Sequence, residues 1–177
     1  MVEPFNLSQI EAIVPWIKEL VSRTGALHGL VHSAGLHALA PLQALSPTKL
    51  ETLLRLNVSS AVFLIKGLRQ RGCAAPGAAA VLVSSVAGLT GQPGLGAYAA
   101  SKAALIGFAR SAAAELAPEG IRVNCVAPGL VQTGMTDRLR SQLTDEQFLA
   151  VKNSHPLGLG TPEDVANSIA FLLDELD

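Results

Sequence analysis

The sequence predicts an α/β fold in which a parallel sheet is covered by helices on both faces. Short apolar segments with strand character alternate with longer segments whose apolar residues recur at helical spacing, and this alternation is typical of parallel sheets built from strand–helix–strand units. The strand segments are almost wholly apolar, as expected for strands buried on both faces. The chain has 177 residues, of which 49% are hydrophobic and 15% charged, so we expect one domain with a substantial core.

The first half of the chain is predicted to contain two helices and one strand. Apolar residues recur at helical spacing over residues 8–21, and Ser8 with Glu11 three residues later has the pattern of an N-terminal capping box. A short apolar strand follows at Leu27–Val31. A long helix is expected from Pro47 to about Arg69, because a Ser-Pro pair suits a cap followed by the first helical position.

The second half continues the alternation. Strands are expected at Ala78–Ser84 and Ile121–Val126, separated by an alanine-rich helix at Tyr98–Leu116. The segment 133–160 is polar and irregular, with room for one or two short helices. A last helix is expected at 161–173, where a threonine cap, a proline and two acidic residues open the first turn.

Charge and composition argue against several classes of function. The net charge is −1 and no basic cluster is present, so nucleic-acid binding has no electrostatic support. No apolar run is long enough for a membrane span, and the N-terminus lacks the pattern of a secretory signal. Cys73 and Cys125 are too few for a disulfide framework, and the four histidines do not form a zinc-like cluster. We therefore expect a cytoplasmic protein without a metal site.

A serine, a tyrosine and a lysine form the strongest chemical signal of the chain. Tyr98 and Lys102 are four residues apart in a predicted helix, so they share one face of it. Ser85 ends a predicted strand thirteen residues before Tyr98. A lysine charge favours the phenolate, so we expect Lys102 to lower the pKa of Tyr98 toward working pH, while Ser85 holds a substrate oxygen. The alternative is a capped strand and an alanine-rich packing helix with an incidental Tyr and Lys.

This arrangement of Ser85 and Tyr98-x-x-x-Lys102 resembles the active site of the short-chain dehydrogenase/reductase family. The resemblance implies that Tyr98 is the general acid/base and that Ser85 orients and polarises the carbonyl group. It also implies that Lys102 lowers the pKa of Tyr98 and binds the ribose hydroxyls of the cofactor. Asn57, at the family's spacing before Ser85, is then expected to disturb its helix locally and to hold a proton-relay water.

Two further motifs are similar to cofactor-binding segments of the same family. The strand at Leu27–Val31 runs into Ala34-Gly35, where the absence of a Gly35 side chain allows close approach of a cofactor. The family usually has Asn-Asn-Ala-Gly here, whereas this chain has His32 and Ser33 in place of both asparagines. The resemblance implies that Ala34 and Gly35 belong to the cofactor site.

The second motif follows the strand at Ile121–Val126. Pro128-Gly129 ends that strand at the carboxyl edge of the sheet, where open α/β sheets bind ligands. By resemblance, Pro128 and Gly129 line the cofactor site, and Val131 and Thr133 meet the nicotinamide carboxamide. The segment 133–160 then corresponds to the family's variable substrate lid.

The resemblance also implies that the Rossmann-like domain is incomplete. Family members begin with a strand, the loop Thr-Gly-x-x-x-Gly-x-Gly and a helix, and no such glycine loop precedes Leu27. The usual last strand has no counterpart before Asp177. Residues 1–177 thus resemble a partial domain, truncated at both ends, that keeps strands four to six. The first of these, Leu27–Val31, is expected to be an open apolar edge, and only half of the NAD or NADP site is expected.

Two functions follow from the resemblance. One is an NAD(P)-dependent oxidoreductase that transfers hydride between nicotinamide and a carbonyl or secondary alcohol, with a 3-oxoacyl or sugar-like compound as a guess at the substrate. The other is a non-catalytic truncated homologue that serves as an assembly subunit. In either case, the helices at 47–69 and 98–116 are expected to build a homodimer or homotetramer, as they do in the family.

Overall fold

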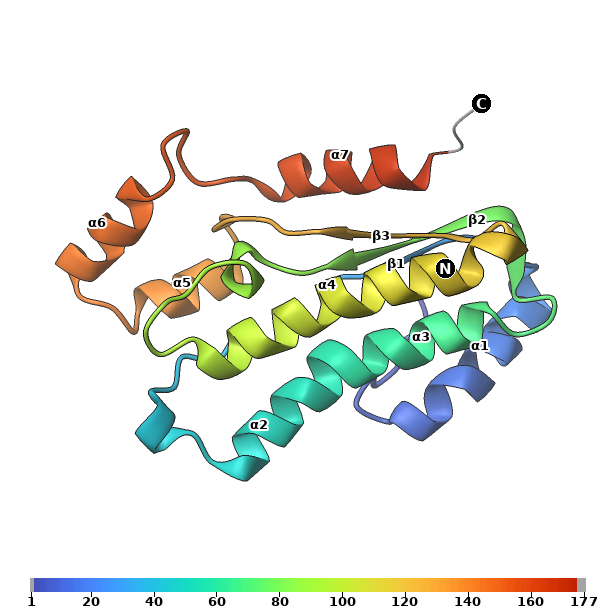
Figure 1. Ribbon diagram of the computed structural model, residues 1–177, viewed down its shortest axis with the longest axis horizontal. Coiled ribbons are helices and arrows are strands. Elements are labelled where there is room, and N and C mark those ends of the chain that lie inside the picture. Colours follow the sequence, from blue (N-terminus) through green and yellow to red (C-terminus); the bar gives the residue numbers. More distant parts are fainter. Residues whose placement is uncertain (1, 175–177) are drawn as a thin grey trace.

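A three-stranded parallel sheet forms the middle of the molecule, with helices on both of its faces (Figure 1). The computed structural model describes residues 2–174. In chain order, its elements are α1 (Ile10–Thr24), β1 (Leu27–His32), α2 (Pro47–Leu54), a π-helical turn (Arg55–Ser59), α3 (Ser60–Leu68), β2 (Ala74–Val83), α4 (Gly96–Leu116), β3 (Arg122–Val126), α5 (Gly134–Arg140), α6 (Asp145–Asn153) and α7 (Pro162–Leu173), with short 3-10 turns between some of them. The predicted α/β class and the predicted order of elements are confirmed.

β2 lies between β1 and β3 and is the most deeply buried strand. Every residue of Ala78–Leu82 exposes 1% of its surface or less. In the register, Val81 stands opposite Val31 on one side and Asn124 on the other. Within residues 2–174, the outer sides of β1 and β3 carry no further strand. The open edge predicted at the first strand is therefore present, and Val31 is 41% exposed there.

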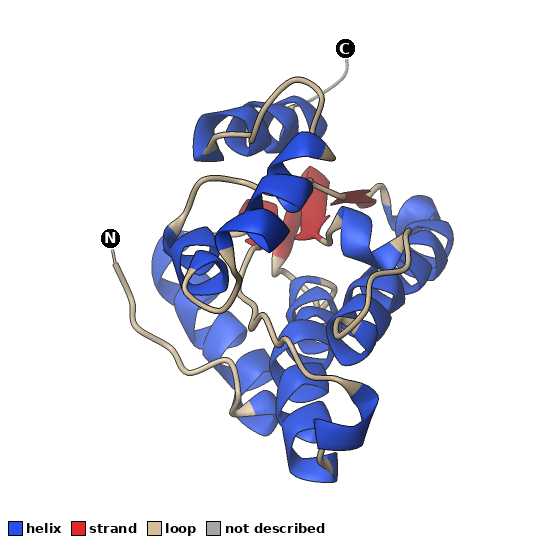
Figure 2. Cartoon of the chain, turned by 90° about the vertical axis from the view of Figure 1, so that its left-hand side faces the viewer, coloured by secondary structure: helices blue, strands red, loops and turns tan. Residues whose placement is uncertain are grey.

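α3 and α4 cover one face of the sheet, and α7 covers the other (Figures 1 and 2). Small side chains on α4 allow its backbone to approach the sheet closely. The buried cluster between these elements consists of Ala61, Ile65, Leu68, Ala80, Leu82, Leu105, Ala109, Ala112, Leu116, Ile121 and Val123. The carboxyl ends of the strands and the start of α4 meet at the left of Figure 1, which is the end that faces the viewer in Figure 2.

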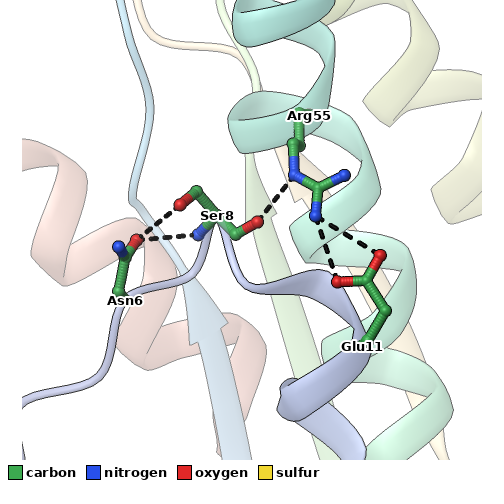
Figure 3. Close-up of polar contacts among 4 residues, drawn as sticks. All are labelled: Asn6, Ser8, Glu11 and Arg55. Atoms are coloured by element: carbon green, nitrogen blue, oxygen red, sulfur yellow. Dashed lines mark hydrogen bonds and ion pairs between the residues drawn. The ribbon is translucent and has the colours of Figure 1, made fainter.

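The capping box predicted for the first helix does not form. α1 begins at Ile10, with no side-chain hydrogen bond at its cap. Instead, the Ser8 amide and hydroxyl both donate to Asn6 Oδ1, at 3.0 and 2.8 Å, and Glu11 pairs with Arg55 at 3.1 Å (Figure 3). Arg55 Nε also donates to the Ser8 carbonyl at 2.7 Å. The prediction is wrong because a partner 44 residues away in the chain outcompetes the local one for Glu11.

β2 begins at Ala74, four residues before the predicted start of the second strand at Ala78. The additional residues include Pro76 and Gly77, which normally interrupt strands. Here the pairing with β1 contains a bulge that shifts the register, and Gly77 adopts a φ of 75° that suits glycine. A local pattern cannot show this irregularity, because the partner strand decides where pairing resumes.

The segment 133–160 contains α5 and α6, in agreement with the predicted one or two short helices. α7 then begins with the predicted threonine cap. The Thr161 hydroxyl accepts a hydrogen bond from the Asp164 amide, and the Asp164 carboxylate accepts one from the Thr161 amide, so a full capping box is present. None of the helices in residues 2–174 has both the length and the apolarity needed to cross a bilayer.

Candidate active site

The stretch Ser84–Gly88 ties the end of β2 to α4. The Ser84 hydroxyl donates a 2.7 Å hydrogen bond to the Lys102 carbonyl. Gly88 lies so close to α4 that a Cβ on it would stand 2.7 Å from the Ala103 nitrogen and 2.8 Å from the Lys102 carbonyl carbon. A side chain at position 88 would therefore collide with helix backbone. These two contacts place Ser85, which lies between Ser84 and Gly88, beside the first turns of α4.

Tyr98 and Lys102 lie one turn apart on the buried face of α4, as their spacing predicts. They expose only 8% and 5% of their surface. The Lys102 ammonium lies 5.7 Å from the centre of the Tyr98 ring and donates a 2.8 Å hydrogen bond to the Val83 carbonyl at the end of β2. An ammonium has three N–H donors, so Lys102 has donors to offer in addition to the one that anchors it.

The ionisation of the pair differs from the expectation. Burial raises the pKa of Tyr98, and the Ser85 hydroxyl lowers it by a smaller amount. Burial lowers the pKa of Lys102, while the nearby Cys125 thiol acts in the opposite direction. The prediction that Lys102 holds the pKa of Tyr98 low is thus not met by this structure, because desolvation of the phenolate is the largest cause of the shift and the opposing contribution comes from Ser85.

Asn57 lies at the centre of the π-helical turn Arg55–Ser59 and is fully buried. Its Oδ1 accepts a 2.7 Å hydrogen bond from the Leu36 amide. Its Nδ2 donates to the Leu36 carbonyl at 2.9 Å and to the Ser101 hydroxyl at 3.0 Å. The expected local disturbance of this helix is present. Its consequence is that one side chain joins the loop after β1 to α4, next to Tyr98 and Lys102.

Gly35 faces the same polar group from the loop after β1. A Cβ on Gly35 would lie 3.3 Å from Asn57 Oδ1 and 3.5 Å from Lys102 Nζ. A larger side chain would crowd the ammonium, whereas glycine leaves space beside it. A cofactor ribose needs donors such as those of Lys102, so Gly35 and Lys102 fit the expected cofactor site, and Ala34 precedes Gly35 in the same loop.

The loop after β3 approaches Ser85 from the other side. The Val86 amide donates to the Pro128 carbonyl at 2.9 Å. Gly129 packs against His155, whose Nε2 accepts a 2.9 Å hydrogen bond from the Leu130 amide. Sequence reasoning did not find this role of His155, because the residue lies 25 positions beyond the loop that it holds.

The residues predicted to meet the carboxamide lie in the segment that leads into α5. Val131 forms a parallel β-bridge with Gly160, and its carbonyl accepts hydrogen bonds from the Thr133 and Thr136 hydroxyls. Thr133 stands at the N-cap position of α5 and is exposed. Both residues are therefore at the same edge of the sheet as Ser85, and the bridge to Gly160 closes the base of the segment 133–160.

His32 and His37, which carry no assigned role in the sequence pattern, belong to the site. The His32 side chain is 1% exposed and its Nε2 lies 2.7 Å from the Ser60 hydroxyl. The His37 ring lies against the Tyr98 ring, with centroids 4.8 Å apart and a tilt of 57°. The sequence contains one indication for His32, which stands where the resemblance predicts an asparagine. It contains none for His37, because a search for clustered histidines as metal ligands does not detect a contact with a tyrosine ring.

The sequence of this chain is similar to those of known reductases. A family model described as Enoyl-(Acyl carrier protein) reductase matches residues 2–177. The 3-oxoacyl-[acyl-carrier-protein] reductase FabG of Staphylococcus aureus (strain N315) is 35% identical over 176 residues, covering 96% of this chain and 68% of the relative. Dehydrogenase/reductase SDR family member 4 of Mus musculus is 41% identical over 130 residues, covering 71% of this chain and 44% of the relative.

Solved structures agree with these matches. The structure described as ElxO with NADP bound superposes with a TM-score of 0.83 at 30% identity, covering 97% of this chain and 69% of that one. A dehydrogenase/reductase from Sinorhizobium meliloti 1021 gives a TM-score of 0.85 at 30% identity, covering 96% of this chain and 66% of that one. The chain thus spans about two thirds of the length of these two structures.

Proposed function

We propose that this chain, which belongs to the short-chain dehydrogenase/reductase family, carries the proton-transfer machinery of a nicotinamide-dependent reductase of carbonyl compounds. The observation that carries the proposal is the meeting of Tyr98, Lys102 and Ser85 at the carboxyl edge of the sheet. The names of the relatives, which include 3-oxoacyl reductases, support the direction of the reaction and an acyl-type substrate.

The proton chemistry follows from the state of Tyr98. Because burial raises its pKa, the phenol is protonated at neutral pH and ready to act as an acid. In reduction, the Tyr98 hydroxyl gives its proton to the carbonyl oxygen, and the Ser85 hydroxyl holds that oxygen by a hydrogen bond. The Lys102 ammonium stabilises the phenolate that results. In oxidation, the phenolate takes the proton back from the alcohol.

The cofactor is proposed to be NAD or NADP. Its nicotinamide, when bound, would supply hydride to the carbonyl carbon. Lys102 and Tyr98 would bind the ribose, Ala34 and Gly35 would allow its approach, and the loop from Pro128 to Thr133 would hold the carboxamide. A structural neighbour described with NADP bound supports a nicotinamide cofactor and leaves both forms as candidates for this chain.

The proposal also covers the domain, the substrate lid and the association of copies of the chain. We take residues 1–177 as one partial domain in which the segment 133–160 is the substrate lid. Association into a homodimer or homotetramer is proposed through the helices within 47–69 and 98–116. The alternative of a non-catalytic assembly subunit is not favoured, because the chain keeps Ser85 and Lys102 in contact with Tyr98 and keeps Asn57 bonded to the neighbouring Ser101.

The test is turnover by matched variants. The chain is assayed with NADH and NADPH and a 3-oxoacyl thioester, following absorbance at 340 nm. Tyr98→Phe is expected to lower kcat by at least about 100-fold, because a positioned general acid contributes roughly 10²–10⁴. Ser22→Ala, at an exposed position on α1 outside the proposed interface, is the control and is expected to keep full activity. Undiminished turnover by Tyr98→Phe would overturn the proposal.

A further inference from the structure

The loop that follows β1 holds a histidine against Tyr98. The centres of the His37 and Tyr98 rings are 4.8 Å apart, and their planes are tilted by 57°. This tilted arrangement is one of the two that aromatic rings prefer. Tyr98 is nearly buried and His37 is half-buried, so the imidazole covers part of the phenol ring that water would otherwise reach.

The loop is pinned on both sides of His37. Asn57 holds both the amide and the carbonyl of Leu36. The Ala40 amide donates a 2.8 Å hydrogen bond to the Gly94 carbonyl, in the segment that leads into α4. The backbone that carries His37 therefore has fixed anchors one residue before it and three residues after it, and one of them is the buried Asn57.

The imidazole itself is not tied to other protein groups. Burial is the sole cause that lowers the pKa of His37, and no hydrogen bond within residues 2–174 acts on its ring. The ring is therefore neutral at neutral pH. The Ser85 hydroxyl and the Lys102 ammonium are also near Tyr98, and the Cys125 thiol acts on Lys102. His37 therefore makes a ring contact with Tyr98 and brings no charge to it.

We propose that His37 is a positioning residue for Tyr98: its imidazole holds the phenol ring in place and keeps water from part of that ring. This inference rests on the proposed function, because it concerns the proposed general acid of the reaction. A shielded phenol keeps its proton until substrate takes it. A phenol without His37 would be wetter and would ionise more easily.

The chain offers a direct test, because Tyr98 is its one tyrosine. Tyrosinate absorbs near 295 nm, so a spectrophotometric pH titration follows Tyr98 alone, and Tyr98→Phe serves as the blank. His37→Ala is expected to shift the titration midpoint of Tyr98 to lower pH. His37→Phe retains a ring at this place and is expected to titrate like the wild type. His28→Ala, on the exposed part of β1, is the control for loss of a histidine.

The outcomes separate this proposal from the proposed function. An unchanged midpoint in His37→Ala would overturn it, and so would a His37→Phe variant that shifts as far as His37→Ala. Far-ultraviolet circular dichroism and the fluorescence of the single tryptophan, Trp16, show whether each variant is folded. The titration needs no turnover, so it decides the role of His37 even where Tyr98→Phe retains activity and the reaction itself is refuted.

Discussion

At the scale of single residues, buried polar groups set the character of the site. The Ser60 hydroxyl donates its one proton to the Leu56 carbonyl at 2.5 Å, so it must accept from His32 Nε2. His32 Nδ1 is then an unprotonated acceptor, and it is buried without a hydrogen-bond partner among the described residues. Burial and the Lys102 charge lower the pKa of His32 to about 4. This histidine is therefore neutral throughout the physiological range.

This state of His32 predicts a pH dependence of stability. In the unfolded chain, His32 takes up a proton near pH 6.5, whereas in the folded chain it does so only near pH 4. Its contribution is fully present above pH 6.5 and is lost as pH falls toward 4. The loss approaches about 3 kcal/mol of the free energy of unfolding.

The measurement is urea unfolding between pH 4 and pH 7. The wild type is expected to lose stability over this range more steeply than His32→Asn, which has no titrating group there. His28→Ala, at an exposed position on the same strand, should keep the wild-type slope. Equal slopes for wild type and His32→Asn would contradict the assignment.

At the scale of elements, close backbone approach positions the site more than side-chain packing does. α4 reaches the end of β2 because Gly88 has no side chain, and Gly35 leaves room for Lys102 in the same way. The π-helical turn lets Asn57 reach Leu36 while α2 and α3 continue as one helical path. The two glycines, which have no Cβ atom, and the π-helical turn thus set how closely the backbone segments of the site approach one another.

Gly88→Ala is expected to destabilise the protein by about 1–3 kcal/mol, because the new methyl group would overlap the backbone of Lys102 and Ala103. Gly91→Ala is the matched control, since nothing lies within 4 Å of a Cβ there, and its effect should stay within about 0.5 kcal/mol. Thermal and urea unfolding measure both. Similar stabilities for the two variants would show that α4 can move away without cost.

At the scale of the whole molecule, one arginine joins the edge strand β3 to the C-terminal end of α7. Arg122, the first residue of β3, donates hydrogen bonds of 2.8, 3.2 and 2.7 Å to the carbonyls of Leu172, Leu173 and Asp174. These carbonyls lack partners within a helix. α7 is thereby fastened at its C-terminal end, while the capping box at Thr161 fixes its beginning.

Arg122→Ala is expected to lower the free energy of unfolding by about 1–2 kcal/mol, because three carbonyls lose a charged donor. Hydrogen exchange should become faster in α7 first. Arg110→Ala, at an exposed position on α4, is the control and should leave exchange in α7 unchanged. Uniform loss of protection across the sheet would argue against a local clamp.

The sequence by itself determined the class of the fold, the order of its elements and the identity of the polar residues at the strand ends. These follow from local periodicity and from the rule that carboxyl ends of parallel strands share one edge. Only the tertiary structure decided the partners of Glu11, the bulge in β2, the contact of His37 with Tyr98 and the raised pKa of Tyr98. These depend on groups distant in sequence, and on burial, which a local pattern does not contain.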